Sequence, residues 1–314
     1  MIDNAFSAWL VDRFGEAVKM NEPMSRHTSL RVGGPADVLV SVNDEAGLKA
    51  LVQECGRRQV PWLVVSGGTN LLVKDQGIRG VVIDMTRGMA GIETIKLNDE
   101  TAHVMARSGT RLPSFCNHAI VNGYGGMAFA LGIPGTVGGA VKMNAGTSRG
   151  TMMDVVDAVE IMNADGTIQK KDQAALVFSY RGFAVKTEKH EMTDGFLILK
   201  AFFSLPREKP EVLRREAKAV LQQRSERQPA GSWSAGCFFR NPQEGPSAGA
   251  LIDAAGLKGR TKGGAAVSDK HANFIINTGQ ATAADILELM TLVQQTVADH
   301  SGTKLEPEVQ IVGE

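Results

Sequence analysis

A glycine-rich stretch at residues 122–146 constrains this chain more than any other feature. It reads NGYGGMAFALGIPGTVGGAVKMNAG, with eight glycines and one charged residue, Lys142. Glycine loses more backbone entropy on folding than other residues, so such a cluster indicates a backbone that turns tightly or approaches a partner closely. With no Cβ atoms in the way, successive N–H groups can point at phosphate oxygens. A tight-turned structural loop in an apolar interior is the alternative interpretation.

The composition is that of an ordinary globular protein. The chain has 314 residues, 43% of them hydrophobic and 22% charged, and its formal net charge is zero. This length leaves room for two or three domains, and without a basic stripe no nucleic acid partner is expected. The N-terminus lacks the basic region and apolar run of a signal peptide, and no apolar segment is long enough to span a bilayer. We therefore expect no membrane association.

The cysteines and histidines show no metal-binding pattern. Cys55, Cys116 and Cys237 have neither paired nor metal-type spacing, and the six histidines are scattered. We therefore expect no metal site and, by default, a reducing cytoplasmic location.

The first part of the chain predicts a β-α-β unit. Residues 1–20 read as a short amphipathic helix or a loose lead-in, and residues 28–37 as a turn between short strands, the second at 38–42. Asn43 or Asp44 can cap the helix that follows. Its apolar residues are spaced by three and four, which places Cys55 in the core; they are Leu48, Leu51, Val52 and Cys55. A buried strand at 60–65 comes next, with parallel pairing expected.

The remaining elements follow from periodicity and turn residues. The predicted strands are 80–85, a β-pair within 92–109, 155–162 and 196–203 with a turn at 163–166 between them, and 305–312. Three more helices are predicted. The first begins at Pro113 and has Cys116 on its buried face, the second spans 211–227, and the third begins at the capping box Thr282–Asp285. We expect domains at residues 1–90, 91–205 and 206–300, with 301–314 as a strand that returns to the body of the protein.

Motifs in the glycine-rich stretch and beyond it carry a family resemblance. Gly132-Ile-Pro-Gly-Thr-Val-Gly-Gly-Ala140 and Met143-Asn-Ala-Gly146 resemble the flavin-binding signature of the UDP-N-acetylenolpyruvoylglucosamine reductase (MurB) family. Further motifs stand in the order of that family: Phe178-Ser-Tyr-Arg-Gly182, Arg224-Ser-Glu-Arg-Gln-Pro229, Ser234-Ala-Gly-Cys-Phe-Phe-Arg-Asn-Pro242 and Leu305-Glu-Pro-Glu-Val309. The resemblance runs over nearly the whole chain.

The resemblance implies an α+β protein with an FAD-binding fold of the vanillyl-alcohol-oxidase/PCMH type. That fold comprises two α/β subdomains, here with a smaller α+β substrate-binding domain. The loop after the strand at 60–65 would hold the pyrophosphate, and since it contains no histidine the FAD would be bound non-covalently. The residues that the resemblance assigns to FAD are Ser66, Gly67, Gly68, Thr69, Asn70, Leu71, Ser108, Gly132, Ile133, Pro134, Gly135, Thr136, Gly138, Gly139, Asn144 and Gly146.

The implied reaction is the NADPH-dependent, FAD-mediated reduction of a UDP-linked enolpyruvyl sugar to UDP-N-acetylmuramate, in peptidoglycan synthesis. Arg181 matches the family's catalytic arginine, and a guanidinium can clamp a carboxylate with two parallel bonds. Glu308 matches the catalytic glutamate, although Glu306 is close enough to be confused with it. Cys237 stands where the family more often has the proton-donating serine. A thiol, with a reference pKa of about 8.5, can donate that proton; alternatively, Cys237 is a small buried residue and water is the donor.

Other positions are expected to meet the substrate. Arg227 falls where the family tends to have a phosphate-binding lysine, and Arg240 and Asn241 adjoin the donor, where they could instead only hold a turn. Tyr180 completes this set. The short connection after residue 205 resembles the subtype that lacks an extra tyrosine-bearing loop. A monomer is expected. The alternatives are another FAD-dependent oxidoreductase of this fold and a non-catalytic flavin- or nucleotide-binding protein.

Overall fold

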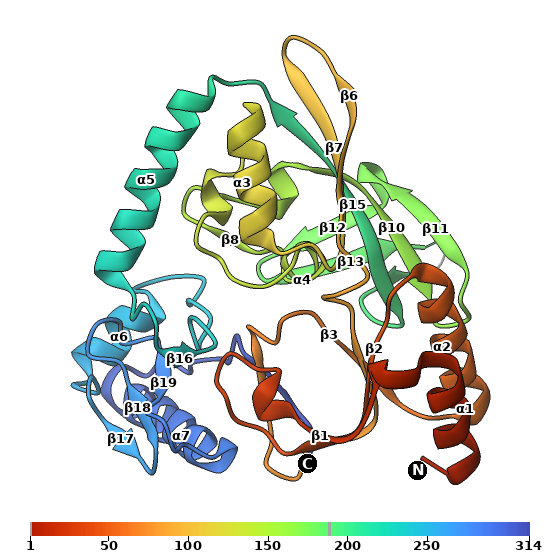
Figure 1. The fold of residues 1–314 in the computed structure, drawn as a ribbon. Coiled ribbons are helices and arrows are strands. Elements are labelled where there is room, and N and C mark those ends of the chain that lie inside the picture. Colours follow the sequence, from red (N-terminus) through yellow and green to blue (C-terminus); the bar gives the residue numbers. More distant parts are fainter. Residues whose placement is uncertain (1, 188–189) are drawn as a thin grey trace. The chain divides into compact units, whose positions relative to one another are not determined.

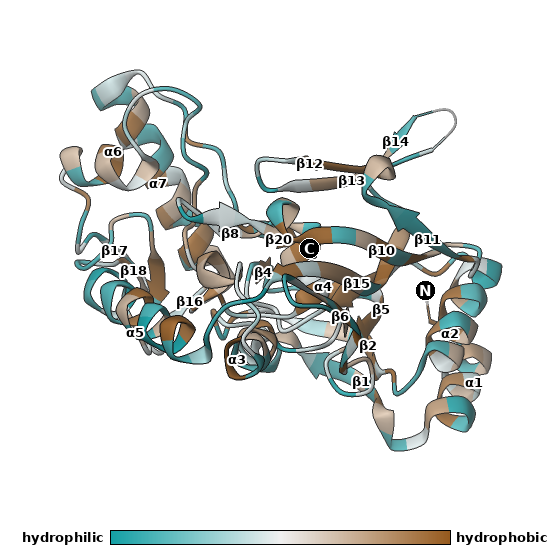
Figure 2. Ribbon diagram, turned by 90° about the horizontal axis from the view of Figure 1, so that it is seen from above, coloured by the Kyte–Doolittle hydropathy of each residue, from teal (hydrophilic) through white to brown (hydrophobic). Residues whose placement is uncertain are grey.

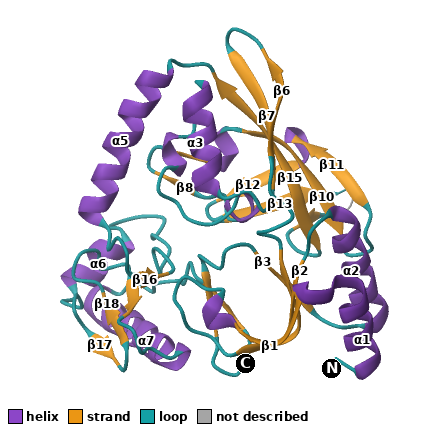
Figure 3. Cartoon of the chain, viewed as in Figure 1, coloured by secondary structure: helices purple, strands orange, loops and turns teal. Residues whose placement is uncertain are grey.

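The computed structural model describes residues 2–187 and 190–314, which form two compact units (Figure 1). Unit 1 contains Met1–Lys19, Leu39–Ser66 and Gly80–Gln223, and unit 2 contains Met20–Val38, Gly67–Arg79 and Arg224–Glu314. Figure 3 separates their helices from their strands. Among the described residues, no helix combines the length and apolar character needed to cross a membrane.

A five-stranded antiparallel sheet forms the centre of unit 1. Its order is β11-β10-β15-β7-β6, and its strands are β6 (Ile92–Leu97), β7 (Thr101–Arg107), β10 (Val156–Asn163), β11 (Ile168–Asp172) and β15 (Phe196–Pro206). The central strand β15 is strongly apolar (Figure 2). The predicted pair within 92–109 is therefore confirmed as β6 and β7, and the strands at 155–162 and 196–203 as β10 and β15.

Helices α3 (Leu112–Asn122) and α4 (Val137–Lys142) belong to the same apolar core as this sheet. Pro113 lies in the first turn of α3, as predicted, and the ring of Phe115 packs 4.6 Å from that of Phe203 on β15. The helix ends at Gly123, whose φ of 72° lies in the left-handed region where glycine carries no steric penalty. The chain then enters the glycine-rich stretch.

Unit 1 also contains α1 (Asn4–Phe14), α2 (Glu45–Arg58) and β3 (Trp62–Val65). Asp44 caps α2 by accepting a hydrogen bond from the Gly47 N–H at 2.6 Å, as predicted. The predicted inner face of α2 is fully buried, Cys55 included. Helix α2 thus follows its sequence periodicity closely.

Parallel pairing is present but involves different strands from the predicted β-α-β unit. Strand β3 pairs in parallel with β5 (Ile78–Asp84). In the sheet order β1-β2-β5-β3, strand β5 lies between β3 and β2 (Pro35–Ser41), the strand that precedes α2. Strand β1 is Val18–Pro23. The nearest strand in sequence is therefore not the neighbour in space.

Several strands of unit 1 were not predicted. Along the chain, the strands of a three-stranded sheet β12-β13-β14 come between β11 and β15, and a short hairpin follows α4. Their bounds are Leu176–Ser179, Gly182–Lys186 and Glu191–Met192 for the sheet, and Gly146–Thr147 (β8) and Gly150–Thr151 (β9) for the hairpin. The turn between β12 and β13 carries Tyr180 and Arg181.

Unit 2 combines a four-stranded sheet of order β16-β19-β18-β17 with α6 and α7. The elements are β16 (Trp233–Ser234), α6 (Ala248–Ala254), β17 (Thr261–Lys262), β18 (Ala265–Val267), β19 (Ile275–Asn277) and α7 (Ala283–Ser301). Thr282 and Asp285 form the predicted capping box of α7. Helix α5 (Pro210–Arg227), also as predicted, runs from unit 1 into unit 2.

A parallel strand pair in unit 2 brings together two segments far apart in sequence. Strand β4 (Leu71–Val73) pairs with β20 (Gln310–Val312), with Leu71 opposite Gln310. Because the strands are parallel, the residues just before each of them meet at the same end of the pair. The end of the loop at 67–70 therefore lies beside the residues that precede β20.

Candidate active site

The loop after β3 has the backbone of an anion-binding site. Gly67 and Gly68 have φ values of 87° and 57°. Among the described residues, no acceptor is present for the N–H groups of Gly67, Gly68 and Thr69. A Cβ on Gly68 would lie 1.9 Å from the carbonyl oxygen of His27, so only glycine fits there. Consecutive free N–H groups in such a turn form a concave nest for phosphate oxygens.

The start of α4 does not offer its N–H groups to a ligand, contrary to one expectation for the glycine-rich stretch. Val137 and Gly138 donate to the carbonyls of Thr110 and Ser108 at 2.8 and 2.9 Å, and Gly139 donates to Thr136 Oγ1. The glycines here permit close packing instead, because a Cβ on Gly138 would lie 2.6 Å from that of Ser108. The N–H groups at the start of α4 are therefore already paired, whereas those of Gly67, Gly68 and Thr69 have no acceptor among the described residues.

The surface around the start of α4 nevertheless has features that no contact among the described residues explains. Gly139 has space beside it, since a Cβ there would meet only Thr136 Oγ1, at 3.7 Å. Gly132 and Gly135 have φ values of 77° and 98° in a turn that also contains Ile133 and Pro134. The buried Ser108 hydroxyl has no hydrogen-bond partner among the described residues. An open glycine surface beside an unpaired hydroxyl fits a bound flat ligand with polar edges.

Ser66 connects the end of β3 to this surface. Its hydroxyl lies 2.6 Å from that of Thr136, the residue that caps α4. Both residues belong to unit 1. Two of the predicted cofactor residues, 70 positions apart in sequence, are thereby brought into contact.

Arg181 is held in a strained conformation beside the end of the glycine-rich stretch. Its φ is 55°, which is uncommon for a residue other than glycine and concentrates at functional positions. Its guanidinium donates to the carbonyl of Gly146 at 3.2 Å and lies 5.0 Å from the ring of Tyr180. Asn144 Nδ2 donates to the Ser179 carbonyl at 2.9 Å. Asn144 and Gly146 therefore support the turn that presents Arg181.

Cys237 and Glu308 are brought together in unit 2 through the backbone of Phe238. The N–H of Glu308 donates to the Phe238 carbonyl at 2.8 Å, and the N–H of Arg240 donates to the Glu306 carbonyl at 2.9 Å. Residues 237–240 and 305–309 thus run alongside each other. Glu308 is partly buried whereas Glu306 is exposed, which favours Glu308 as the carboxylate of a binding site.

The flavin-type loop is tied to Glu308 directly. Asn70 Nδ2 donates to the Glu308 carbonyl at 3.1 Å, and the Asn70 carbonyl accepts from the Gln310 N–H at 3.0 Å. Leu71 begins β4 and is nearly buried. Hydrogen bonds of Asn70 therefore connect the segment predicted to hold a cofactor to the strand segment that carries the predicted catalytic glutamate.

The predicted substrate residues differ in how they are placed. Arg227 is exposed at the last residue of α5. The Nε atom of Arg240 is buried and has no hydrogen-bond partner among the described residues, which suits a guanidinium that receives an anion. Asn241 accepts a hydrogen bond from the Ala248 N–H at 3.0 Å and so stabilises the start of α6.

Arg224 was not predicted to be a site residue, although it begins the motif at residues 224–229. It sits on α5, three residues before Arg227, and is partly buried. Burial lowers the pKa of its guanidinium from the ordinary value, and a Coulombic interaction with Cys237 opposes that shift. Arg224 is therefore coupled electrostatically to Cys237. The sequence feature that could have indicated Arg224 is its position in the last turn of the predicted helix, one turn before Arg227.

Cys237 differs from the other cysteines in its surroundings. Burial raises the pKa of the Cys55 thiol and that of the Cys116 thiol to about 12. Both side chains are fully or almost fully buried, as predicted, whereas Cys237 is partly exposed. Of the three thiols, Cys237 is the accessible one.

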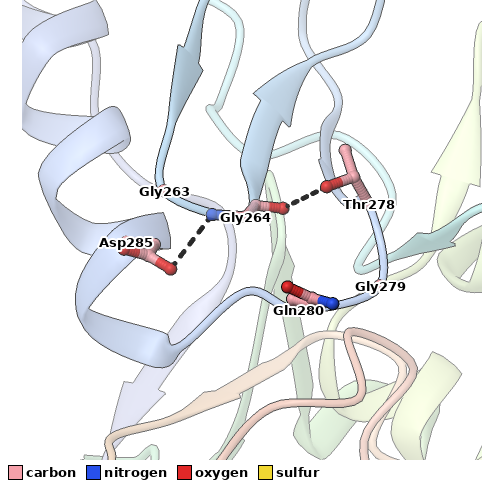
Figure 4. A pocket seen from close by; sticks show the side chains of 6 residues that line it. All are labelled: Gly263, Gly264, Thr278, Gly279, Gln280 and Asp285. Carbon is pink, nitrogen blue, oxygen red and sulfur yellow. Dashed lines mark hydrogen bonds between the residues drawn. The ribbon is translucent and has the colours of Figure 1, made fainter.

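A pocket elsewhere in unit 2 contains none of the predicted site residues. Its volume is about 590 Å³, and its lining comprises Gly263, Gly264, Thr278, Gly279, Gln280 and Asp285. Figure 4 shows the Asp285 carboxylate accepting from the Gly264 N–H and the Thr278 hydroxyl donating to the Gly264 carbonyl. Asp285 also belongs to the capping box of α7. These polar groups hold a turn, so the pocket does not compete with the site above.

Comparison with known proteins agrees with this arrangement. The family model "FAD binding domain" matches residues 36–171, and the model "UDP-N-acetylenolpyruvoylglucosamine reductase, C-terminal domain" matches residues 228–312. The protein is thus a flavin-binding oxidoreductase with a PCMH-type FAD-binding fold followed by a dedicated C-terminal domain.

Full-length relatives narrow this class to one family. The chain is 48% identical over 313 residues to the UDP-N-acetylenolpyruvoylglucosamine reductase of Desulfosudis oleivorans, covering 100% of both chains. It is 40% identical to that of Caldanaerobacter subterraneus, covering 97% of this chain and 98% of the relative. The crystal structure of the Thermus caldophilus enzyme superposes with a TM-score of 0.79 at 35% identity, covering 94% and 98% of the two chains. The chain belongs to the UDP-N-acetylenolpyruvoylglucosamine reductase (MurB) family.

Proposed function

We propose that this chain reduces the enolpyruvyl group of UDP-N-acetylglucosamine enolpyruvate, with Arg181, Cys237 and Glu308 as its catalytic residues. The observation that carries the residue assignment is the backbone link between Phe238 and Glu308, which holds a thiol and a carboxyl group on adjoining segments. Bound FAD would supply the hydride chemistry, which is the acceptance of hydride from NADPH and its delivery to the β-carbon of the substrate double bond. The open glycine surface, the loop at 66–69 and the Ser108 hydroxyl are the features that fit this cofactor.

The protein side chains deal with the charge that this reduction creates. Negative charge develops on the α-carbon and its carboxylate, and a guanidinium such as that of Arg181 stabilises it there. Glu308 serves as a hydrogen-bond partner of the enol intermediate. The Cys237 thiol then forms the new C–H bond by giving its proton to the α-carbon, and the Arg224 cation stabilises the thiolate left behind. The thiolate regains a proton from solvent before the next turnover.

Substrate binding outside the reacting group is proposed for Tyr180, Arg227, Arg240 and Asn241. The buried, unpaired Nε of Arg240 supports a contact with an anionic part of the substrate. The connection from β15 to α5 spans only residues 207–209, which supports the subtype without an extra tyrosine-bearing loop. We also propose that the protein is a cytoplasmic monomer. Its proposed domains are residues 1–90, 91–205 and 206–300, followed by the C-terminal strand at 301–314.

The half-reactions of Cys237 variants test this assignment. Cys237→Ala, loaded with FAD, should be reduced by NADPH at the wild-type rate but should lose reoxidation by the substrate, because it lacks the proton donor. Cys237→Ser should restore part of that second step, since a hydroxyl can also donate. Reoxidation of Cys237→Ala at the wild-type rate would show that another group supplies the proton.

A further inference from the structure

Asn273 is a buried amide that holds the segment following Cys237. Its side chain is 3% exposed. Asn273 Oδ1 accepts from the Phe239 N–H at 2.9 Å, and Asn273 Nδ2 donates to the Phe239 carbonyl at 2.8 Å. The backbone carbonyl of Asn273 accepts from the Phe238 N–H at 2.8 Å. One residue thus forms three hydrogen bonds to the two residues after Cys237.

Glu308 also hydrogen-bonds to the segment that follows Cys237. Its N–H donates to the Phe238 carbonyl at 2.8 Å. Both backbone polar groups of Phe238 and both of Phe239 are therefore occupied, and the two rings are buried. Asn273, the Cys237 segment and Glu308 form a continuous hydrogen-bonded row in unit 2.

We propose that Asn273 is a positioning residue that sets the place of the Cys237 thiol relative to Glu308. This rests on the proposed function, in which the Cys237 thiol protonates the α-carbon of the enol intermediate that Glu308 stabilises by hydrogen bonding. An amide side chain presents a donor and an acceptor side by side, so it can pair with both the N–H and the carbonyl of one residue, as a neighbouring strand would. Displacing reacting groups by about 1 Å can cost about 100-fold in rate, so a residue with no substrate contact can control the proton transfer.

Asn277 provides a matched control in the same region. It is 6% exposed, its Nδ2 donates to the Leu30 carbonyl at 2.9 Å, and its Oδ1 accepts from the N–H groups of Gly279 and Ala281 at 2.8 and 3.0 Å. Asn277→Asp and Asn273→Asp therefore both turn a buried donor into an acceptor that faces a carbonyl. Only Asn273→Asp does so on the Cys237 segment.

The test compares these variants as FAD-loaded proteins in two assays. One follows anaerobic flavin reduction by NADPH and reoxidation by the enolpyruvyl substrate. The other follows alkylation of the Cys237 peptide by iodoacetamide across pH 6–10, read by mass spectrometry. At pH 8 the thiols of Cys55 and Cys116, with pKa values of about 12, are almost entirely protonated, so alkylation reports Cys237.

For Asn273→Asp we expect reoxidation to slow about 10- to 100-fold and the pH profile of Cys237 alkylation to shift, with flavin reduction unchanged. Asn277→Asp should match the wild type in both assays. If Asn273→Asp does not fold, Asn273→Gln takes its place, because it keeps a donor and an acceptor but moves both outward. Wild-type reoxidation and an unshifted alkylation profile in the Asn273 variant would overturn the proposal.

The two arms also separate this proposal from the proposed function. The alkylation profile reads the setting of the Cys237 thiol whether or not that thiol is the donor. A shifted profile together with normal reoxidation in Cys237→Ala would keep the positional link and remove the donor role.

Discussion

Replacing each of two neighbouring glycines of α4 by alanine distinguishes a glycine needed for folding from a glycine needed for ligand binding. Gly138 and Gly139 lie side by side in the helix, yet their surroundings differ. A Cβ on Gly138 would lie 2.6 Å from Ser108 Cβ and 3.2 Å from Ser108 backbone atoms. A Cβ on Gly139 would meet only Thr136 Oγ1 at 3.7 Å, an ordinary contact.

The expected stabilities follow from these distances. Replacing glycine by alanine inside a helix stabilises the folded protein by about 0.5–1 kcal/mol, whereas overpacking destabilises it by about 1–3 kcal/mol. Gly138→Ala should therefore be less stable than wild type without FAD, with a melting temperature lower by roughly 2–6 °C. Gly139→Ala should melt no lower than wild type, because its methyl group has room.

FAD affinity should rank the variants differently. If the flavin lies against the start of α4, the methyl group of Gly139→Ala occupies its place, and we expect the Kd for FAD to rise tenfold or more, about 1.4 kcal/mol. The assay is thermal unfolding of apoprotein and FAD-loaded protein, with Kd from quenching of flavin fluorescence. Unchanged FAD affinity in Gly139→Ala would refute the placement of the cofactor on this surface.

Three further substitutions test individual site residues. Ser108→Ala removes a buried hydroxyl without a partner, so the apoprotein should gain about 1 kcal/mol while FAD binds more weakly; equal FAD affinity in an equilibrium titration would contradict the assignment. Arg181→Lys should keep flavin reduction by NADPH but slow reoxidation by substrate at least tenfold, since a single ammonium cannot clamp a carboxylate; unchanged turnover would remove Arg181 from the mechanism. Glu308→Gln should slow the same step, whereas the exposed Glu306→Gln should not, and the reverse order in stopped-flow traces would exchange their roles.

Elements with strong periodicity were predictable from the sequence. The core face of α2 and the burial of Cys55 and Cys116 follow from apolar spacing, and the start of α7 follows from its capping box. Local pattern does not give the whole surface, however. Helix α5 carries Leu213, Ala217, Val220 and Leu221 at helical spacing, yet Leu221 is 46% exposed while the other three are buried, because neighbouring elements decide which part of a helix is covered.

Short exposed strands escaped prediction because they carry little pattern. Strand β11 reads IQKKD and is mostly exposed, so no apolar alternation marks it. The hairpin of β12 and β13 presents Arg181, and its turn was recognised only through the family motif. Strand order is also non-local, as the position of β5 between β2 and β3 shows.

The candidate site was predictable where a family motif covered it. Arg224 and Asn273 were missed because the roles proposed for them depend on tertiary structure: an electrostatic interaction of Arg224 with Cys237, and hydrogen bonds of Asn273 to Phe238 and Phe239. The contact between the Asn273 side chain and Phe239 joins residues 34 positions apart, which no local pattern indicates. The N–H groups of α4 were misjudged for the same reason, since their acceptors at Ser108 and Thr110 lie in another segment.

Anaerobic flavin absorbance of the purified protein tests the central claim most directly. NADPH is added first, and UDP-N-acetylglucosamine enolpyruvate second. We expect the first addition to bleach the flavin band and the second to restore it, with UDP-N-acetylmuramate as the product. Bleaching without recovery would contradict the proposed substrate chemistry, and a protein that stays colourless after FAD is added would contradict the flavin site itself.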